Sequence, residues 1–279
     1  MRYQKQKKIV QKRDEKFTNR TVTRIWQEEP LPTNPYLAAT CRCHGYDLLE
    51  LTKKCSFVDV LFLLFQGELP DRNQADLLEK LMIALINPGP RHPATRASMN
   101  AAVGKAEPAH ILPTGLTVLS GAHLGGEEVS AAMHFLRKQG KKNASAVADE
   151  LLSQPHENHW EGDWHIAPGF GTRFGGIDPI PQKIINVLEK LPAAGKAIKW
   201  GNKFVTAITR QGMGWLDTGL AAAVLYDLGF HYRAGAGLFQ LLRAPGILAH
   251  GLELANKPIT AMPFLDEEHY VIAKQARKE

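Results

Sequence analysis

The chain has 279 residues, of which 44% are hydrophobic and 22% are charged, a composition that excludes a disordered or collagen-like protein. Its 34 Lys and Arg outnumber its 28 Asp and Glu, for a net charge of +6. Residues 1–25 hold nine basic and two acidic residues, a net +7, whereas the other 254 residues hold 25 basic and 26 acidic ones, a net −1. The basic character therefore belongs to an N-terminal arm and does not indicate a nucleic-acid-binding body.

The cysteine content and the N-terminus predict the cellular compartment of the protein. Three cysteines are an odd and sparse set, and the polar N-terminus has no apolar signal-peptide region, so we expect a reduced, cytoplasmic protein. No segment reaches the roughly 18 apolar residues of a membrane span. We expect neither a membrane nor a nucleic acid as a partner.

The predicted elements are mostly helices. Residues 26–40 contain three prolines and are expected to run extended across the surface. Ser56 is the predicted N-cap of a helix that ends at Gly67, and apolar residues at three and four spacing predict an amphipathic helix over 73–87. Further helices are predicted at about 94–105, 109–122, 129–142, 143–153, 181–192, 197–211, 216–228 and 235–256.

Residues 153–182 differ from the helical pattern around them. They are rich in Gly, Pro, His and Trp and show little periodicity, which is typical of a long functional loop. Alternating strand patterns are almost absent from the whole chain. The sequence therefore predicts a mostly α protein with one Gly-rich irregular region in its middle.

Several passages, in register, resemble one family. They are CHGYDLLELTKKCSFVDVLFLLFQGELP (43–70), LSGAHLGGEEVSAAM (119–133) and APGFGTRFGGIDP (167–179), followed by AVLYDLGF and LFQLLRAPGILAHGLE within 223–253. Their order and spacing are similar to those of the citrate synthase superfamily over roughly residues 24–275. The shortness of the chain resembles the citryl-CoA lyase-like members.

The resemblance implies a citrate-synthase-like two-domain helical fold. After the basic arm of residues 1–25, residues 26–126 plus 233–279 would form a large domain. Residues 127–232, which carry the GFGTRFGG loop, would form a smaller inserted domain. The active site would lie in the cleft between the domains of a homodimer.

The resemblance also implies an activity. Enzymes of this type form or cleave a carbon–carbon bond next to a CoA thioester, so the expected ligands are an acyl-CoA substrate and a small keto or carboxylic acid. No permanently bound cofactor is expected.

The family's three catalytic positions are all substituted here. The enol-stabilising His corresponds to Leu124, with His123 one place earlier, and the family's Asp corresponds to Thr218, with Asp217 one place earlier. The carbonyl-polarising His corresponds to Thr172. We therefore predict His123 and Asp217 as displaced acid/base groups and Thr172 as a neutral hydrogen-bond donor.

Ligand-binding positions are partly retained. Arg243 matches a carboxylate-binding Arg of the family, and Arg173 suits a carboxylate or phosphate because a guanidinium binds anions bidentately. Three residues of the Gly-rich loop are predicted to contact CoA, namely Gly169, Phe170 and Gly171. The family's keto-acid-binding His near the LIN turn is replaced by Pro88, and its Arg after the DP dipeptide by Ile180.

A cluster of ligand-type residues lies just before this loop, made up of His156, His159 and His165 with Glu157, Glu161 and Asp163. Metal sites use such residues, but the spacing is unspecific, and a polar loop is the interpretation we favour, with no metal site predicted. Two alternatives to the enzyme stay open. One is a pseudoenzyme that keeps CoA binding or acts as a scaffold, and the other is a metal-assisted CoA-thioester hydrolase built on this segment.

Overall fold

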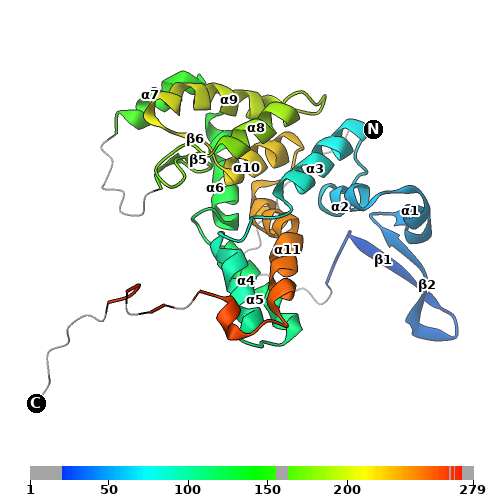
Figure 1. The fold of residues 1–279 in the computed structure, drawn as a ribbon. Coiled ribbons are helices and arrows are strands. Elements are labelled where there is room, and N and C mark those ends of the chain that lie inside the picture. The colour runs from blue at the N-terminus through cyan, green and yellow to red at the C-terminus, as the bar shows by residue number, and fades with distance from the viewer. Residues whose placement is uncertain (1–20, 155–162, 264, 267, 272–279) are drawn as a thin grey trace, which may run out of the picture. The chain divides into compact units, whose positions relative to one another are not determined.

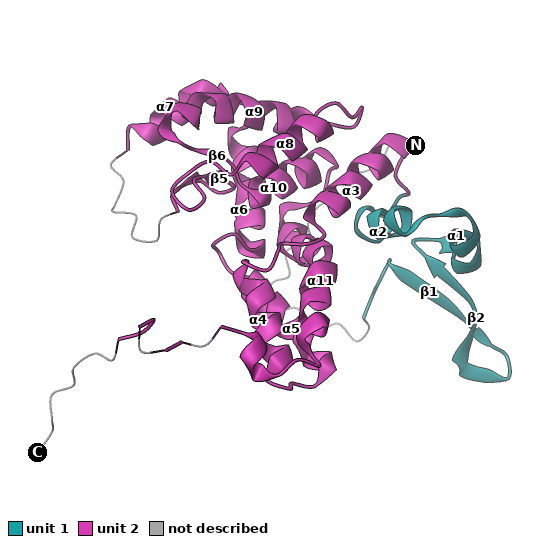
Figure 2. Ribbon diagram, viewed as in Figure 1, with its two compact units in different colours: residues 1–68 teal, residues 69–279 magenta. Residues whose placement is uncertain are grey.

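The computed structural model describes residues 21–154, 163–263, 265–266 and 268–271. The chain divides into two compact units, residues 1–68 and 69–279, which Figure 2 colours separately. Helices make up most of the described chain and its strands form two three-stranded sheets (Figure 1), which confirms the predicted mostly α fold. The predicted domain boundaries after residues 126 and 232 both lie inside the second unit, so that division stays a prediction. Residues 1–20 of the predicted arm lie outside the described residues.

The first unit begins with a β-hairpin where we expected a simple extended run. Strands β1 and β2 pair antiparallel from Trp26 opposite Cys43 to Leu31 opposite Asn34, with a register shift at Pro30. Most residues of the hairpin are exposed on both faces, so no alternation of apolar and polar residues marks it in the sequence. The elements are β1 (Trp26–Leu31), β2 (Asn34–Cys43), β3 (Tyr46–Asp47), α1 (Leu48–Lys54) and α2 (Phe57–Gln66).

Helix α2 begins and ends where the sequence predicts. The Ser56 hydroxyl accepts the Asp59 N–H at 3.2 Å, and the Ser56 N–H donates to the Asp59 carboxylate at 2.8 Å, which together form a capping box. Gly67 ends the helix with a φ of 83°, a left-handed conformation that glycine adopts without steric cost.

The second unit contains the other helices, and each predicted helix range overlaps an observed one. The helices are α3 (Arg72–Leu85), α4 (Pro93–Val103), α5 (Pro108–Leu119), α6 (Gly126–Gln139), α7 (Ala144–Leu152), α8 (Pro179–Leu188), α9 (Lys196–Ile208), α10 (Asp217–Asp227) and α11 (Gly235–Leu254). Short 3₁₀ turns lie at Thr209–Gln211, Tyr232–Ala234 and Ile259–Ala261. No described helix has the length and apolar character needed to cross a membrane.

Helix α10 forms the centre of this unit. Every residue from Thr218 to Leu225 is buried, and the helix packs against α3, α6, α8 and α9 (Figure 1). A helix that is covered on all sides carries small and apolar residues all round, which explains the run LAAAVL. Its first residue, Asp217, is the point at which this buried helix meets the candidate site.

The Gly-rich region contains two short strands that the sequence did not predict. Strands β4 (His165–Ala167) and β5 (Phe170–Gly171) pair antiparallel, and β5 pairs with β6 (Gly214–Trp215) just before α10. Strands of two or three residues are too short to show a period of two, so pattern alone could not find them. This sheet brings the GFG segment next to the start of α10.

Candidate active site

A cavity of about 400 Å³ lies within the second unit, at the N-termini of α4, α8 and α10. Its charged and titratable lining consists of Arg91, His92, Arg173, Asp178, Asp217 and Arg243. The remaining lining residues are Pro88, Leu124, Phe174, Ile177, Pro179 and Leu216. The cavity therefore holds three arginines and two carboxylates in a partly apolar wall.

Asp217 and Arg243 form an ion pair at this cavity. Asp217 is the first residue of α10, and its carboxylate accepts from the Arg243 guanidinium, which comes from the middle of α11 and is only 3% exposed. The neighbouring Thr218 is fully buried, and its hydroxyl has no hydrogen-bond partner among the described residues. Of the two candidates for the acidic position, the structure thus brings Asp217 to the cavity.

Arg173 reaches the same cavity and is held by two contacts. Its Nη1 donates to the Asp163 carboxylate at 2.7 Å, and its guanidinium lies 4.1 Å from the centre of the Phe174 ring. Burial acts to raise the pKa of Asp163, but Arg173 and the Phe174 N–H outweigh it and hold that pKa below its usual range. Asp163 is therefore a carboxylate at neutral pH.

His92 is a cavity residue that sequence reasoning missed. It is the N-cap of α4, and its Nδ1 accepts the Ala94 N–H at 3.1 Å. Burial, together with the charge of Arg243, lowers the pKa of His92 to about 4, so its imidazole is neutral at pH 7. A His directly before Pro93 is a recognisable capping signal, but nothing in the sequence shows that this cap faces the cavity.

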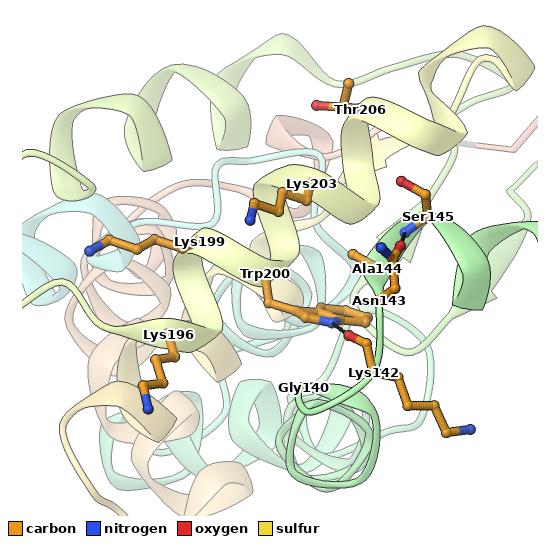
Figure 3. Close-up of a pocket in the computed structure, with 10 residues that line it drawn as sticks. All are labelled: Gly140, Lys142, Asn143, Ala144, Ser145, Lys196, Lys199, Trp200, Lys203 and Thr206. Carbon is orange, nitrogen blue, oxygen red and sulfur yellow. Dashed lines mark hydrogen bonds between the residues drawn. The ribbon is translucent and has the colours of Figure 1, made fainter.

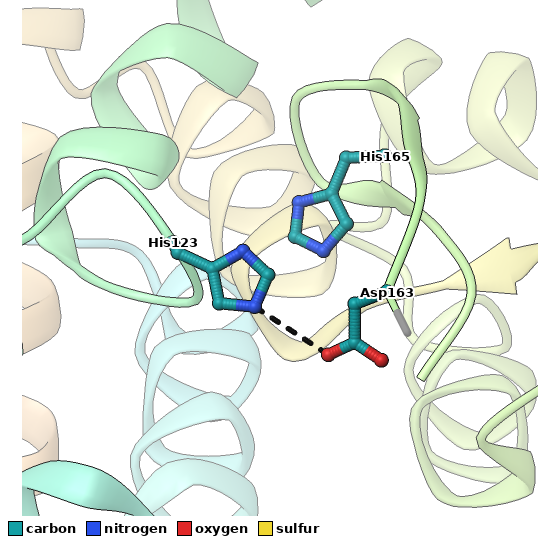
Figure 4. A group of neighbouring side chains, drawn as sticks. All are labelled: His123, Asp163 and His165. Atoms are coloured by element: carbon teal, nitrogen blue, oxygen red, sulfur yellow. Dashed lines mark ion pairs between the residues drawn. The ribbon is translucent and has the colours of Figure 1, made fainter. Parts of the chain in front are cut away.

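A second group of titratable residues lies around His165. The His165 Nδ1 is 2.6 Å from the Glu128 Oε1, and its ring stacks on that of His123 with centroids 4.7 Å apart. The His123 Nε2 lies 3.4 Å from the Asp163 Oδ2. Figure 4 shows the side chains of His123, Asp163 and His165 turned toward one another. Glu128 also accepts the Leu124 N–H at 2.8 Å and the Gly169 N–H at 3.0 Å.

These contacts keep Glu128 ionised although it is buried. Burial acts to raise the pKa of Glu128. The hydrogen bond with His165 and the two backbone N–H groups lower that pKa by more, so the net shift is downward. The charged carboxylate thus joins three segments, namely the loop before α6, the segment that holds His165, and the turn at Gly169.

Other predicted site residues have structural partners and do not line the cavity. The Thr172 hydroxyl oxygen accepts the Trp164 N–H at 2.7 Å, and the Phe170 ring is fully buried against Phe204 and Trp215. A Cβ on Gly171 would lie 2.1 Å from the Trp164 carbonyl oxygen, so close packing already accounts for that glycine. The roles predicted for Thr172, Gly169, Phe170 and Gly171 remain predictions.

The predicted site residues thus separate into two groups. Asp217, Arg173 and Arg243 meet at the cavity, whereas His123, which is half-exposed, lies in the group around His165. Asp163 and Arg173 connect the two groups through their ion pair. His156, His159, Glu157 and Glu161 lie outside the described residues.

A larger cavity, of about 510 Å³, lies elsewhere, between α7 and α9 (Figure 3). Its lining includes four lysines, Lys142, Lys196, Lys199 and Lys203, around the Trp200 ring, whose Nε1 donates to the Lys142 carbonyl at 3.0 Å. None of the predicted site residues lines it.

Comparison with known proteins gives a structural likeness and no sequence match. No family model and no curated protein matches the sequence. Citryl-CoA lyase from Hydrogenobacter thermophilus superposes with a TM-score of 0.74 at 24% identity, over 93% of this chain and 96% of that one. ATP citrate lyase from Methanosaeta concilii gives 0.67 at 16% identity, over 91% of this chain and 43% of that one.

Citrate synthase from Thermoplasma acidophilum also superposes, with a TM-score of 0.59 at 18% identity, over 80% of this chain and 58% of that one. All three superpositions cover 80% or more of this chain. The chain therefore shares the fold of these solved structures of citryl-CoA lyase, ATP citrate lyase and citrate synthase.

Proposed function

We propose that this chain binds an acyl-CoA and a small carboxylic acid and forms or cleaves the carbon–carbon bond between them. The observation that carries the proposal is the cavity that gathers Asp217, Arg243, Arg173 and a neutral His92. The fold adds support, since the structures with this fold include an ATP citrate lyase in complex with (3S)-citryl-CoA and a citrate synthase in complex with carboxymethyl coenzyme A and oxaloacetate.

The charges of the cavity favour an anionic ligand. Three arginines face two carboxylates, and one of these, Asp178, is already engaged as the N-cap of α8, where it accepts the Ile180 N–H at 2.9 Å. Guanidinium groups bind carboxylates bidentately, so Arg243 and Arg173 are the proposed partners of the acid. Among the described residues, Asp217 is the one ion-pair partner of Arg243. A substrate carboxylate would bind the same guanidinium beside Asp217.

Asp217 and His92 supply the proposed acid–base chemistry. For bond formation, Asp217 takes a proton from the carbon next to the thioester, and the resulting enolate carbon attacks the keto carbonyl of the acid. The former carbonyl oxygen then takes up the proton that Asp217 removed, so the proton count balances. Cleavage runs through the same steps in reverse. His92 accepts at Nδ1, so its proton lies on Nε2, where it interacts with the Leu124 backbone. A substrate carbonyl would replace that partner, and a neutral imidazole of this kind polarises a carbonyl as a hydrogen-bond donor.

The other roles come from the sequence resemblance. His123 is proposed as a second acid/base group and Thr172 as a neutral donor, although neither lines the cavity. Gly169, Phe170 and Gly171 are proposed to lie beside the CoA. A homodimer is also proposed, supported by large apolar side chains that stay exposed on the packed pair α5 and α11, namely Val118, Leu241 and Leu252.

Calorimetry and product analysis test the proposal. Purified protein is titrated with CoA and acetyl-CoA, and products from a panel of 2-keto acids and citryl-type thioesters are identified by mass spectrometry. We expect CoA binding and turnover with at least one acid. Asp217→Asn should lower kcat by about 100-fold or more while CoA binding is retained, because it removes the base and keeps the shape. Asp149→Asn, at an exposed position on α7, is the matched control and should leave both unchanged.

A pseudoenzyme that binds CoA without turnover is the second candidate. It is favoured by Leu124 and Thr172, which place no imidazole at two positions where the family has one. CoA binding with no product across the whole panel would establish this candidate and refute turnover. Absence of CoA binding would refute both.

A further inference from the structure

His123, Asp163 and His165 bring three metal-ligand atoms together beside the cavity. One ligand atom from each lies within 4.8 Å of the other two (Figure 4). We propose that these residues bind a divalent transition-metal ion of the zinc type, with two imidazole nitrogens, one carboxylate oxygen and an open position for water. This site goes beyond the proposed function, which uses no metal.

His165 is oriented as a metal-binding histidine is. Its Nδ1 lies 2.6 Å from the Glu128 Oε1, a contact that holds the ring proton on Nδ1 and leaves the lone pair on Nε2. The Nε2 is buried and has no hydrogen-bond partner among the described residues. A carboxylate behind a histidine is the usual arrangement around protein metal ions, because it sets the tautomer and fixes the ring.

His123 and Asp163 are already at the spacing of two ligands on one ion. Their Nε2 and Oδ2 atoms are 3.4 Å apart, and two atoms bonded to one tetrahedral zinc at about 2.0–2.1 Å are also about 3.4 Å apart. The Asp163 side chain is 5% exposed and the His123 side chain is 49% exposed, so His123 is the ligand with room to turn. In the proposed site the His123 ring leaves its stack with His165, so that a nitrogen of each ring reaches the same ion.

The local charges favour a cation. The cluster holds two carboxyl groups, Glu128 and Asp163, against one guanidinium, Arg173, whose Nη1 donates to the Asp163 Oδ2 at 2.7 Å. The second lone pair of that oxygen remains for a metal ion, and Arg173 would then stay as a hydrogen-bond donor behind the ligand. The net charge of the three groups is −1 before a metal binds.

Metal binding is tested on the full chain, free of any affinity tag and treated with chelator. Calorimetry with Zn²⁺ should show one site per chain, and Co²⁺ should give a visible absorption band from nitrogen and oxygen ligands. His123→Ala should weaken Zn²⁺ binding at least 100-fold, and Glu128→Gln should weaken it about 10–100-fold through loss of the support behind His165. His110→Ala, at an exposed position on α5, is the control and should leave binding unchanged.

The outcomes separate this inference from the proposed function. No one-site Zn²⁺ binding, or binding that His123→Ala leaves unchanged, would overturn the metal site. Loss of binding in His159→Ala with full binding in His123→Ala would also overturn it. CoA titrations on chelator-treated protein report on the proposed function independently. Circular dichroism confirms that each variant is folded, and His123→Ala, at an exposed position, keeps the test valid even if Glu128→Gln does not fold.

Discussion

Asp217 and Thr218 show how much one residue matters in a helix. Successive side chains on an α-helix differ in direction by about 100°, so at the start of α10 one neighbour faces the cavity and the other faces the core. The structure puts the carboxylate of Asp217 on Arg243 and buries the Thr218 side chain completely. The family pattern alone pointed to position 218, and only the helix orientation brings position 217 to the site.

The lowered pKa of His92 predicts how the free energy of unfolding depends on pH. In the unfolded chain its imidazole takes up a proton near its ordinary pKa of about 6.5, whereas in the folded chain it stays neutral down to a pKa of about 4. Stability from this group is therefore complete above pH 6.5 and is lost as the pH falls toward 4, by up to about 3 kcal/mol.

Urea unfolding at pH 7, 5.5 and 4.5 measures this loss. In His92→Gln the decline over that range should be smaller by about 2 kcal/mol, even if the variant is less stable at pH 7 through the weaker cap. His110→Gln, at an exposed position, should decline like the parent chain. Equal declines in all three proteins would contradict the assigned pKa of His92.

At the scale of elements, the backbone at the start of α10 lies very close to the backbone of the turn before β5. A Cβ on Gly219 would lie 2.0 Å from the Gly169 carbonyl oxygen, and a Cβ on Gly169 would lie 2.4 Å from the Gly219 Cα. Gly169 also has a φ of +82°, so two requirements meet at one residue. These glycines let the GFG segment and the helix that carries Asp217 pack backbone to backbone.

Gly219→Ala should destabilise the fold by about 1–3 kcal/mol, because the added methyl group meets backbone that cannot move aside. Gly237→Ala is the matched control, since Gly237 is exposed on α11 and nothing lies within 4 Å of its added Cβ. There the substitution should stabilise by up to about 1 kcal/mol through higher helix propensity. Opposite shifts of the urea midpoint are the expected result, and a stabilised Gly219→Ala would contradict the described close approach.

At the scale of the whole molecule, the prediction concerns the oligomeric state, which we propose to be a homodimer. Light scattering after size exclusion should give a mass of twice 30.9 kDa for the full chain. Leu241→Glu, which places a charge on the exposed face of α11, should shift the mass toward 30.9 kDa because an apolar interface does not accommodate an unpaired charge. A monomeric full chain would refute the dimer. A chain lacking residues 1–20 shows whether the basic arm takes part.

Local sequence determined where the helices lie, and for α2 also where it begins and ends, because capping residues and apolar spacing act over a few positions. Ser56 and Gly67 bound α2 as predicted, and the fold class followed from such patterns together with the family motifs. Two of the three arginines of the cavity were also recognisable, since Arg173 and Arg243 lie in those motifs, whereas Arg91 was not predicted.

Only the tertiary structure decided which polar residues share a site. His92 comes from the start of α4 and Asp217 from the start of α10, more than a hundred residues later, and no local pattern links them. The same holds for Glu128 and His165, whose contact depends on how α6 packs against the Gly-rich turn. Helix propensity and capping are local, whereas a cavity is made by side chains that converge from distant segments when the apolar faces of those helices are buried together.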